Sequence, residues 1–211
     1  MGALIELKNI GYSYHNLAGE TDAIKDVSFQ VEEGEFVALV GPSGCGKSTL
    51  LSIIAGLLAP ETGTIVVNNP DGSLHYPRVG YMLQHDHLFE WRTIYQNVTL
   101  GLEIHHALTK ERTDYVKQLL SDYGLESFQD KRPSELSGGM KQRAALIRTL
   151  ALDPQLLLLD EPFSALDPIT RTQLQDELLG LQEELHKTIV FVTHDMDEAV
   201  KIADKICVMD K

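Results

Sequence analysis

A glycine-rich stretch that ends in lysine and serine fits the phosphate-binding pattern G-x-x-x-x-G-K-[ST] at every fixed position. Glycine allows the backbone to fold closely around an anion, with its N–H groups directed inward at phosphate oxygens. Lys47 is expected to reach the β- and γ-phosphates of a nucleotide, and Ser48 is expected to bind Mg²⁺. The predicted nucleotide-binding residues are Gly41, Pro42, Ser43, Gly44, Cys45, Gly46, Lys47, Ser48 and Thr49.

The segments on either side of this stretch provide the context that the pattern requires. Residues 36–40 are apolar and predict a buried strand, and residues 49–56 predict a helix that stops at Gly56. The start of that helix carries a partial positive charge, which favours phosphate. A glycine-rich turn could match the pattern by chance, but the strand–loop–helix order favours a nucleoside triphosphate site.

A pair of carboxylates follows the apolar run at 156–159 and gives a second nucleotide motif. Asp160 closes a predicted buried strand, next to where the strand of the phosphate loop should end, and could hold Mg²⁺. Glu161 points elsewhere because it is the next residue along the chain, so it could polarise an attacking water. The alternative is an Asp-Glu pair that merely begins a turn before Pro162.

A serine and two glycines stand before a segment of strong helix-forming residues at 141–151. Ser137 is a predicted N-cap, and Gly138 and Gly139 would expose backbone N–H groups to an anion. The phosphate loop already supplies one such site, so a second one is best explained if it serves the nucleotide of another molecule. A plain Ser-Gly-Gly cap before an amphipathic helix is the alternative.

These residues must be positioned by an alternation of strands and helices. Short strands are predicted at 3–9 and 24–40, with a hairpin-like turn at 32–35, and again at 63–67 and 78–83, on either side of a dense turn signal at 68–72. A capping box at 93–96 opens a helix, and 110–122 has a helical period, so 93–135 is predicted to be a helical block.

The C-terminal third returns to an alternating pattern. Buried strands are predicted at 156–159 and 188–193, and a last strand at 205–209. Asp167 is a predicted N-cap, with proline at the first helical position, for a helix that extends to about residue 185. A second capping box at 195–198 opens a short helix.

Composition narrows the range of possible partners. The net charge of −13 argues against a nucleic-acid binder held by phosphate contacts and against direct adsorption to an anionic bilayer. The two cysteines, Cys45 and Cys207, form no disulfide framework and no metal-binding spacing, which fits a reducing cytosol. No apolar run approaches the length of about 20 residues that a membrane-spanning helix needs.

Taken together and in this order, the motifs resemble those of the ATP-binding subunits of ABC transporters, over essentially the whole chain. Gln84 resembles the family's Q-loop glutamine, residues 164–167 its D-loop, and His194 its switch histidine. Tyr14 lies where the family stacks an aromatic ring on adenine, although Tyr12 or Tyr14 could simply face the core. Met140 stands where glutamine is commoner in the family. The sequence also stops at Lys211, earlier than relatives usually do, and this early stop suggests a trimmed chain or a short subunit without a regulatory domain.

The resemblance implies an α/β fold with a P-loop NTPase core, a mostly parallel sheet flanked by helices, an antiparallel β subdomain and an inserted helical subdomain. The core would comprise 1–84 and 154–211, and the helical subdomain, including the signature helix, 85–153. ATP and Mg²⁺ are the implied ligands, with Gln84 joining Ser48 and Asp160 at the metal. Lys47, Gln84, Glu161 and His194 are the implied catalytic residues.

The implied function is ATP hydrolysis in a head-to-tail dimer that drives solute import through a separate permease, with a solute-binding protein as indirect partner. Leu88, Phe89 and Trp91 form an apolar loop after Gln84, where the family docks its permease, at the cytoplasmic face of the membrane. The amino-acid sequence of this loop resembles that of importers of the nitrate, sulfonate and taurine group. A metal site at His85, Asp86 and His87 is the alternative, but MgATP chemistry needs no further metal.

Other functions fit the sequence less well. A DNA-repair or chromosome-organising ATPase of the same superfamily carries a very long coiled-coil insertion before the signature, whereas Gln84 and Ser137 are only 53 positions apart. A tandem translation factor would need two cassettes in one chain. A P-loop kinase would lack the signature, and exporters often fuse the membrane part to the cassette.

Overall fold

The computed structural model describes residues 3–16, 19–68, 76–164 and 166–210, and its centre is a five-stranded parallel sheet. The strand order is β5-β6-β7-β3-β8. The strands are β3 (Phe36–Val40), β5 (Val79–Met82), β6 (Leu156–Asp160), β7 (Thr188–Thr193) and β8 (Lys205–Val208). Every residue of β3, β6 and β7 is buried, as expected for parallel strands covered on both faces.

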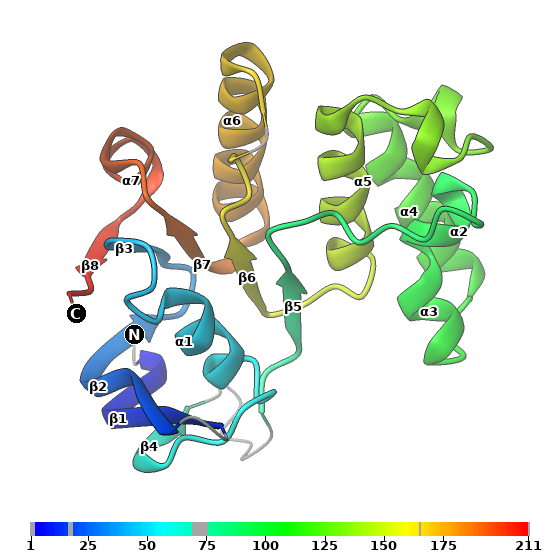
Figure 1. Ribbon diagram of the computed structural model, residues 1–211. Helices are drawn as coiled ribbons and strands as arrows, with labels where there is room; N and C mark the ends of the chain where they lie inside the picture. The colour runs from blue at the N-terminus through cyan, green and yellow to red at the C-terminus, as the bar shows by residue number, and fades with distance from the viewer. Residues whose placement is uncertain (1–2, 17–18, 69–75, 165, 211) are drawn as a thin grey trace.

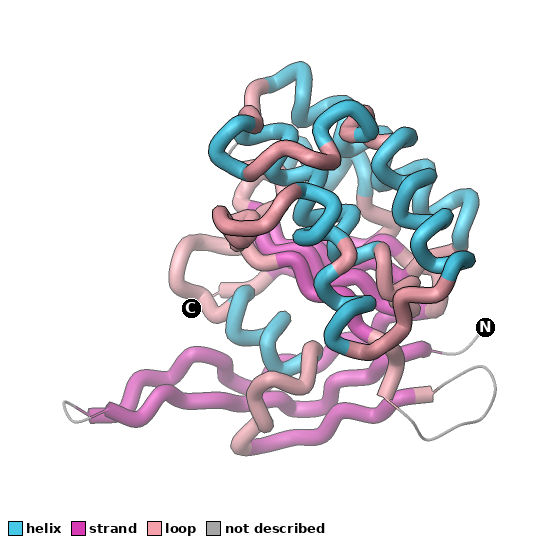
Figure 2. The backbone as a smooth tube through the Cα atoms, turned by 90° about the vertical axis from the view of Figure 1, so that its right-hand side faces the viewer, coloured by secondary structure: helices cyan, strands magenta, loops and turns pink. Residues whose placement is uncertain are grey.

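Alternate side chains of these strands enter two separate hydrophobic cores. Leu157 and Leu159 belong to the core that the helices within 94–150, 168–185 and 196–202 complete, whereas Leu156 and Leu158 face the core that contains the helix at 47–54 and the second sheet. This division follows from the two-residue period of a strand. The parallel sheet is therefore the middle layer of the molecule (Figure 2).

The second sheet has three antiparallel strands in the order β2-β1-β4, namely β1 (Ala3–Asn16), β2 (Gly19–Glu32) and β4 (Thr62–Val67). Strand β1 continues to Asn16, beyond the predicted segment 3–9, and β2 begins at Gly19, before the predicted start at residue 24. Register shifts interrupt the pairing of β1 with β2 at four places between Ala3 and Ser13. Beyond them the two strands pair regularly, but Tyr14, His15 and residues 19–22 are all exposed, so this end of the sheet has no buried face that an alternation could reveal.

The turn at 32–35 is present, but it is not a hairpin. Glu35 N–H donates to Glu32 O at 3.2 Å, as in a tight turn. The flanking strands then part: β2 pairs with β1, and β3 pairs with β7 and β8 in the other sheet. The turn thus links the two sheets. The predicted turn at 68–72 lies outside the described residues after Asn68.

Helix α1 (Lys47–Ile54) lies between the two sheets, and the remaining helices lie beyond the parallel sheet (Figures 1 and 2). The predicted helical block, 93–135, contains several short elements. These are α2 (Ile94–Val98), α3 (Leu100–Ile104), α4 (Lys110–Asp122) and the 3₁₀ turns η1 (Glu126–Phe128) and η2 (Pro133–Glu135). Helix α5 (Gly138–Leu150) follows the block. Helices α6 (Pro168–Leu185) and α7 (Met196–Ile202) follow β6 and β7.

Helix starts agree with the predictions at two places and differ at one. Thr93 and Gln96 form a complete capping box, and the Asp167 carboxylate caps α6, with Pro168 at its first position. At α7, Asp195 accepts from the N–H groups of Asp197 and Glu198. Glu198 does not complete the predicted box, because its carboxylate accepts from the Thr193 hydroxyl instead.

Within the described part of the chain, no helix combines the length and the apolar character needed to cross a membrane.

Candidate functional site

Four loops that carry predicted site residues leave the same edge of the parallel sheet. The phosphate loop follows β3, Gln84 follows β5, Asp160 and Glu161 end β6, and His194 follows β7. The carboxyl ends of parallel strands meet at one edge, where ligands bind in open α/β sheets. Strand β7 lies between β3 and β6, so the carboxylates are not at the end of the strand next to β3, as expected, but one strand further away.

The phosphate loop has a shape that only glycine permits at two positions. Gly46 has φ 96°, and a Cβ there would lie 2.2 Å from the carbonyl oxygen of Ala23. At Gly41 (φ 158°) a Cβ would lie 2.3 Å from the carbonyl oxygen of Met209. No side chain caps the start of α1, which Gly46 precedes. The helix start is therefore free to direct backbone N–H groups and its dipole at an anion.

Lys47 lies inside this loop. Its side chain is 6% exposed, and its ammonium donates to the carbonyl oxygens of Gly41 at 2.7 Å and Pro42 at 2.9 Å. The Cys45 sulfur is 3.7 Å from the same nitrogen. A buried positive charge thus lies at the uncapped start of α1, an arrangement suited to a polyphosphate.

Asp160 provides a buried carboxylate next to the phosphate loop. Burial raises its pKa, the Ser48 hydroxyl donates to it and lowers the pKa, and the neighbouring Glu161 raises it. Lys47 also lowers it by charge. A hydroxyl and a carboxylate beside a buried lysine form an oxygen donor set of the kind that Mg²⁺ prefers when it also binds phosphates. These residues therefore fit the predicted metal.

Glu161 is the meeting point of two other loops. Gln84 Nε2 donates to Glu161 Oε2 at 3.0 Å, and His194 Nδ1 lies 3.6 Å from Glu161 Oε1. The backbone of Glu161 has φ 47°, in the left-handed region that residues other than glycine, asparagine and aspartate rarely adopt. Its N–H donates to Val192 O at 3.1 Å. The structure thus brings Gln84, Glu161 and His194 together, although Gln84 lies 77 positions before Glu161 in the sequence and His194 lies 33 positions after it.

Tyr14 reaches the phosphate-loop helix from the long arm of the antiparallel sheet. Its hydroxyl lies 3.1 Å from the Thr49 hydroxyl, and its ring is largely exposed. Tyr12 packs against the core and contacts Tyr14 edge to face, with ring centroids 5.1 Å apart. Glu61 accepts from the backbone N–H of Ser13 at 3.2 Å and bonds to His15 Nε2 at 2.7 Å, so both neighbours of Tyr14 are anchored.

The signature residues lie elsewhere in the chain. Ser137 caps α5 by accepting from Met140 N–H at 3.4 Å, and both Ser137 and Gly138 are exposed. A Cβ on Gly139 would lie 2.7 Å from Thr170 Cγ2, at the start of α6. Helix α5 stands apart from α1 in Figure 1, and no contact among the described residues joins Ser137 to Lys47. One chain therefore presents two separate helix starts to solvent.

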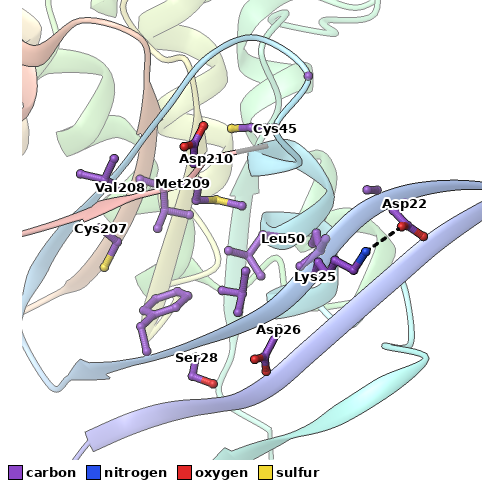
Figure 3. A pocket seen from close by; sticks show the side chains of 16 residues that line it. Asp22, Lys25, Asp26, Ser28, Cys45, Leu50, Cys207, Val208, Met209 and Asp210 are labelled. Carbon is purple, nitrogen blue, oxygen red and sulfur yellow. Dashed lines mark hydrogen bonds and ion pairs between the residues drawn. The ribbon is translucent and has the colours of Figure 1, made fainter.

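A hollow of about 840 Å³ opens on another side of the phosphate loop, between β2 and the C-terminal strand (Figure 3). Cys45, Leu50 and Met209 contribute apolar walls, and an ion pair of Lys25 with Asp22 lies at its rim. None of the predicted catalytic residues lines it. Two of the predicted catalytic residues, Glu161 and His194, instead line a cavity of only about 40 Å³ at the edge of the sheet.

The apolar loop after Gln84 differs from its prediction at one residue. Leu88 is 8% exposed and belongs to the helical core, so it cannot present a surface to a partner. Trp91 is 70% exposed, and Phe89, which is half-buried, packs against it with ring centroids 4.7 Å apart. Of the D-loop residues, Ser164, Leu166 and Asp167 are described and residue 165 is not.

Sequence reasoning missed Arg171 and Glu198, which both contact this edge. Arg171 Nη1 lies 3.5 Å from Glu198 Oε1, and both residues line the cavity beside Glu161. Each follows a predicted loop residue by four positions, Asp167 and His194 respectively. Because helical side chains point back toward the N-terminus, this spacing could have indicated their contact with the loops.

Comparison with protein families and curated proteins gives consistent matches. A family model described as ABC transporter matches residues 24–164. The ABC transporter ATP-binding protein YtlC of Bacillus subtilis (strain 168) is 46% identical over 204 residues, which cover 97% of this chain and 78% of that protein. The sulfate/thiosulfate import ATP-binding protein CysA of Synechocystis sp. is 49% identical over 197 residues, covering 90% and 55%. The nitrate transport protein NasD of Klebsiella oxytoca is 40% identical over 212 residues, covering 99% and 81%.

Solved structures give the same result. The dimeric structure of MJ0796, a bacterial ABC transporter cassette, superimposes with a TM-score of 0.86 and 35% identity over 98% of this chain and 94% of that one. A dimeric post-hydrolysis state of the ATP-binding cassette MJ0796, bound to ADP and Pi, gives a TM-score of 0.85 and 34% identity over 97% and 94%. These likenesses confirm the predicted α/β fold of a P-loop NTPase cassette.

Proposed function

Because this chain belongs to the ATP-binding proteins of ABC transporters and is an ATPase of that family, we propose that it powers solute import through a separate membrane permease. The observation that carries the proposal is the grouping of Gln84, Glu161 and His194 at the sheet edge that also bears the phosphate loop. Curated relatives named as sulfate/thiosulfate and nitrate transport proteins support import.

The proposed role of each residue in ATP binding and hydrolysis follows from its contacts. Lys47 and the N–H groups of residues 41–49 would bind the phosphates of ATP, and Ser48, Asp160 and Gln84 would hold Mg²⁺. When bound, Mg²⁺ neutralises charge on the phosphates. Glu161 would accept a proton from the attacking water, while Gln84 and His194 keep its carboxylate in place.

Replacing Tyr14 with alanine should weaken ATP binding by about 1–3 kcal/mol, the usual loss for a base–aromatic stack. The effect should be similar for other nucleoside triphosphates, because stacking accepts any π-face. Titration of each variant with nucleotide provides the measurement. Tyr12→Ala is the matched control, since Tyr12 packs against the core. A larger loss of ATP affinity in Tyr12→Ala than in Tyr14→Ala would show that Tyr14 is not the stacking residue.

We infer that the signature residues serve a second copy of the chain. Ser137, Gly138 and Gly139 form an exposed helix start that no described contact connects to Lys47. The dimeric MJ0796 cassettes show that proteins of this fold pair. In a head-to-tail pair, the signature of one copy would cover the γ-phosphate held by the other, so ATP would close the dimer and hydrolysis would open it.

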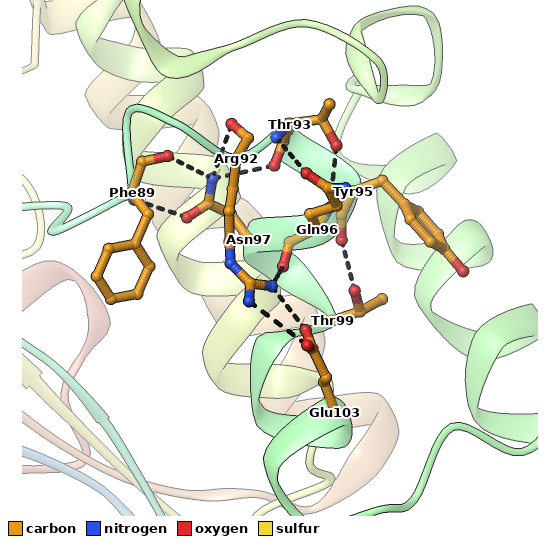
Figure 4. A network of polar contacts seen from close by, with 8 residues as sticks. All are labelled: Phe89, Arg92, Thr93, Tyr95, Gln96, Asn97, Thr99 and Glu103. Atoms are coloured by element: carbon orange, nitrogen blue, oxygen red, sulfur yellow. Dashed lines mark hydrogen bonds and ion pairs between the residues drawn. The ribbon is translucent and has the colours of Figure 1, made fainter.

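The proposed permease surface is the loop that presents Trp91, and a polar network holds it rigidly (Figure 4). The fully buried Asn97 accepts from Phe89 N–H at 2.7 Å and donates to Phe89 O at 3.1 Å and Thr93 O at 3.0 Å. Arg92 pairs with Glu103 at 2.6 Å. A loop that is already ordered loses less conformational freedom when a partner binds, which favours affinity.

A second set of contacts links this loop to the signature helix. From α5, Arg148 donates to the carbonyl oxygens of His87 at 2.8 Å and Asp86 at 2.6 Å. A displacement of the loop by the permease would therefore be transmitted to α5. This coupling supports the proposed division into an ATP-binding core, 1–84 and 154–211, and a helical subdomain, 85–153. We further propose that the chain works at the cytoplasmic face of the membrane, with a solute-binding protein as indirect partner.

Replacing Trp91 with alanine should leave the basal ATPase rate of the isolated chain unchanged and weaken its assembly with the permease. A central aromatic anchor commonly contributes about 2 kcal/mol or more to binding. The ring is 70% exposed, so its loss should not affect folding. Co-purification with the permease and ATPase assays in reconstituted membranes provide the measurements.

Leu57→Ala is the matched control for this test, because Leu57 is 67% exposed but lies beyond α1, outside the loop. It should assemble with the permease like the unaltered chain. Equal weakening by the two substitutions, or a loss of basal ATPase in Trp91→Ala, would argue against the docking role.

A further inference from the structure

An ionic network lies directly behind Glu161 and joins the two loops that flank it. Arg171, in the first turn of α6, donates through Nη2 to the carbonyl oxygen of Leu166 at 3.4 Å. Its Nη1 lies 3.5 Å from Glu198 Oε1 and 3.7 Å from Asp195 Oδ2. One guanidinium thus connects the loop after β6 to the start of α7, which follows the loop after β7.

Glu198 extends the network to both neighbours of His194. Its Oε2 accepts from the Thr193 hydroxyl at 2.5 Å, and that hydroxyl in turn accepts from Asp195 N–H at 3.0 Å. Thr193 is 2% exposed and Glu198 is 8% exposed, whereas the side chain of His194 is 63% exposed. The position of His194 relative to Glu161 is therefore set through the anchored residues on either side of it.

The charges in this cluster depend on one another. Burial raises the pKa of the Glu198 carboxyl, the Thr193 hydroxyl lowers it by donating to it, Asp195 raises it, and Arg171 lowers it. Removing Arg171 would leave the buried Glu198 carboxylate beside the partly exposed Asp195 carboxylate without the counter-charge that contacts both. Such an unpaired charge is costly and tends to be relieved by protonation or by movement of the segment that carries it.

From these contacts we propose that Arg171 and Glu198 are positioning residues for hydrolysis, which fix the loop of His194 against Leu166 in the loop after β6. The inference rests on the proposed catalytic role of His194. Neither residue contacts the phosphate loop in the described part of the chain, so their effect should fall on turnover and not on nucleotide affinity. A misplacement of about 1 Å in a catalytic group can reduce the rate about 100-fold.

The test compares steady-state ATP hydrolysis by the whole chain and four variants. Arg171→Ala should lower kcat by about 10- to 100-fold and change the KM for ATP by less than about twofold, because the phosphate loop is untouched. Arg171→Ala combined with Glu198→Gln should regain part of kcat. The glutamine amide oxygen can still accept from Thr193, and the repulsion between the two carboxylates is gone.

Lys201→Ala is the matched control, because Lys201 also joins α7 to α6, through Asp176 at 3.3 Å, but contacts neither loop. It should keep normal kcat. If Arg171→Ala and Lys201→Ala change kcat equally, or if the Arg171→Ala loss disappears once rates are divided by the folded fraction from thermal unfolding, the positioning role is wrong. Should Arg171→Ala fail to fold, Arg171→Met makes the same test, since methionine is similarly long but has neither a donor for Leu166 O nor a charge for the carboxylates; normal kcat would then overturn the inference.

The fourth variant, His194→Ala, separates this inference from the proposed function. A loss of turnover in His194→Ala without one in Arg171→Ala rejects the positioning pair alone. Normal turnover in His194→Ala rejects the proposed role of the histidine itself.

Discussion

Glu161→Gln should bind ATP with unchanged affinity and hydrolyse it at least about 100-fold more slowly, the usual effect of losing a general base. The substitution keeps the size of the side chain and leaves Ser48 and Asp160 to hold Mg²⁺. It removes only the carboxylate that Gln84 and His194 contact. Since ATP would then remain bound, size-exclusion chromatography with MgATP should show a persistent dimer.

Phosphate release and nucleotide titration on the same preparation separate catalysis from binding in this variant. Glu183→Gln is a matched control, because Glu183 is an exposed carboxylate on α6, remote from the β6 loop in sequence. It should hydrolyse ATP normally. Near-normal turnover in Glu161→Gln would exclude Glu161 as the catalytic base.

The second large effect concerns two variants that are each inactive and become active when mixed. Lys47→Ala removes the ammonium inside the phosphate loop, and Ser137→Arg places a bulky side chain at the start of α5. In a mixed dimer, one site would join both damaged parts, and the other would join an intact loop to an intact signature. Random mixing makes about half of the dimers mixed, so about a quarter of the normal number of sites should be intact.

ATPase activity of the mixture is the measurement, and affinity tags of two kinds show that mixed dimers form. Ser134→Arg is the matched control, since Ser134 is exposed three residues before Ser137 and does not cap α5; alone it should keep its activity. If the tags show that mixed dimers form but the ATPase activity of the mixture stays at the level of the separate variants, the model in which two chains share each site is rejected. Recovery limited to below a quarter would instead indicate coupling between the two sites.

Much of the fold could be predicted because local rules and tertiary contacts agree in most segments. The apolar run at 156–159 is buried on both faces, and Thr93 and Asp167 cap helices where their side chains can accept from free N–H groups. The ends of the long arms could not be predicted, because residues 14, 15 and 19–22 are exposed and give the arms no buried apolar face. The turn at 32–35 has the sequence of a hairpin, and only the pairing of β3 with β7 and β8 shows that it joins two sheets.

The site residues divide in a similar way. Lys47, Asp160 and Glu161 lie within short motifs whose spacing carries the chemistry, so sequence alone could single them out. Arg171 and Glu198 belong to no such motif, and their relation exists only after α6 and α7 have folded beside each other. Leu88 was misassigned because an apolar residue in a loop has the same sequence signature whether it faces a partner or the core.

Strand β5 is a short edge strand of the parallel sheet. It is four residues long, and among the strands in the described part of the chain it pairs with β6 alone. A Cβ on Gly80 would lie 2.7 Å from Thr149 Cγ2, so this strand is packed closely against α5. An edge strand can loosen from one neighbour at a lower free-energy cost than a central strand, which must leave two. Mechanical force arriving through α5 would therefore move β5, and with it Gln84, before it disturbed the strands that hold Lys47 and Asp160.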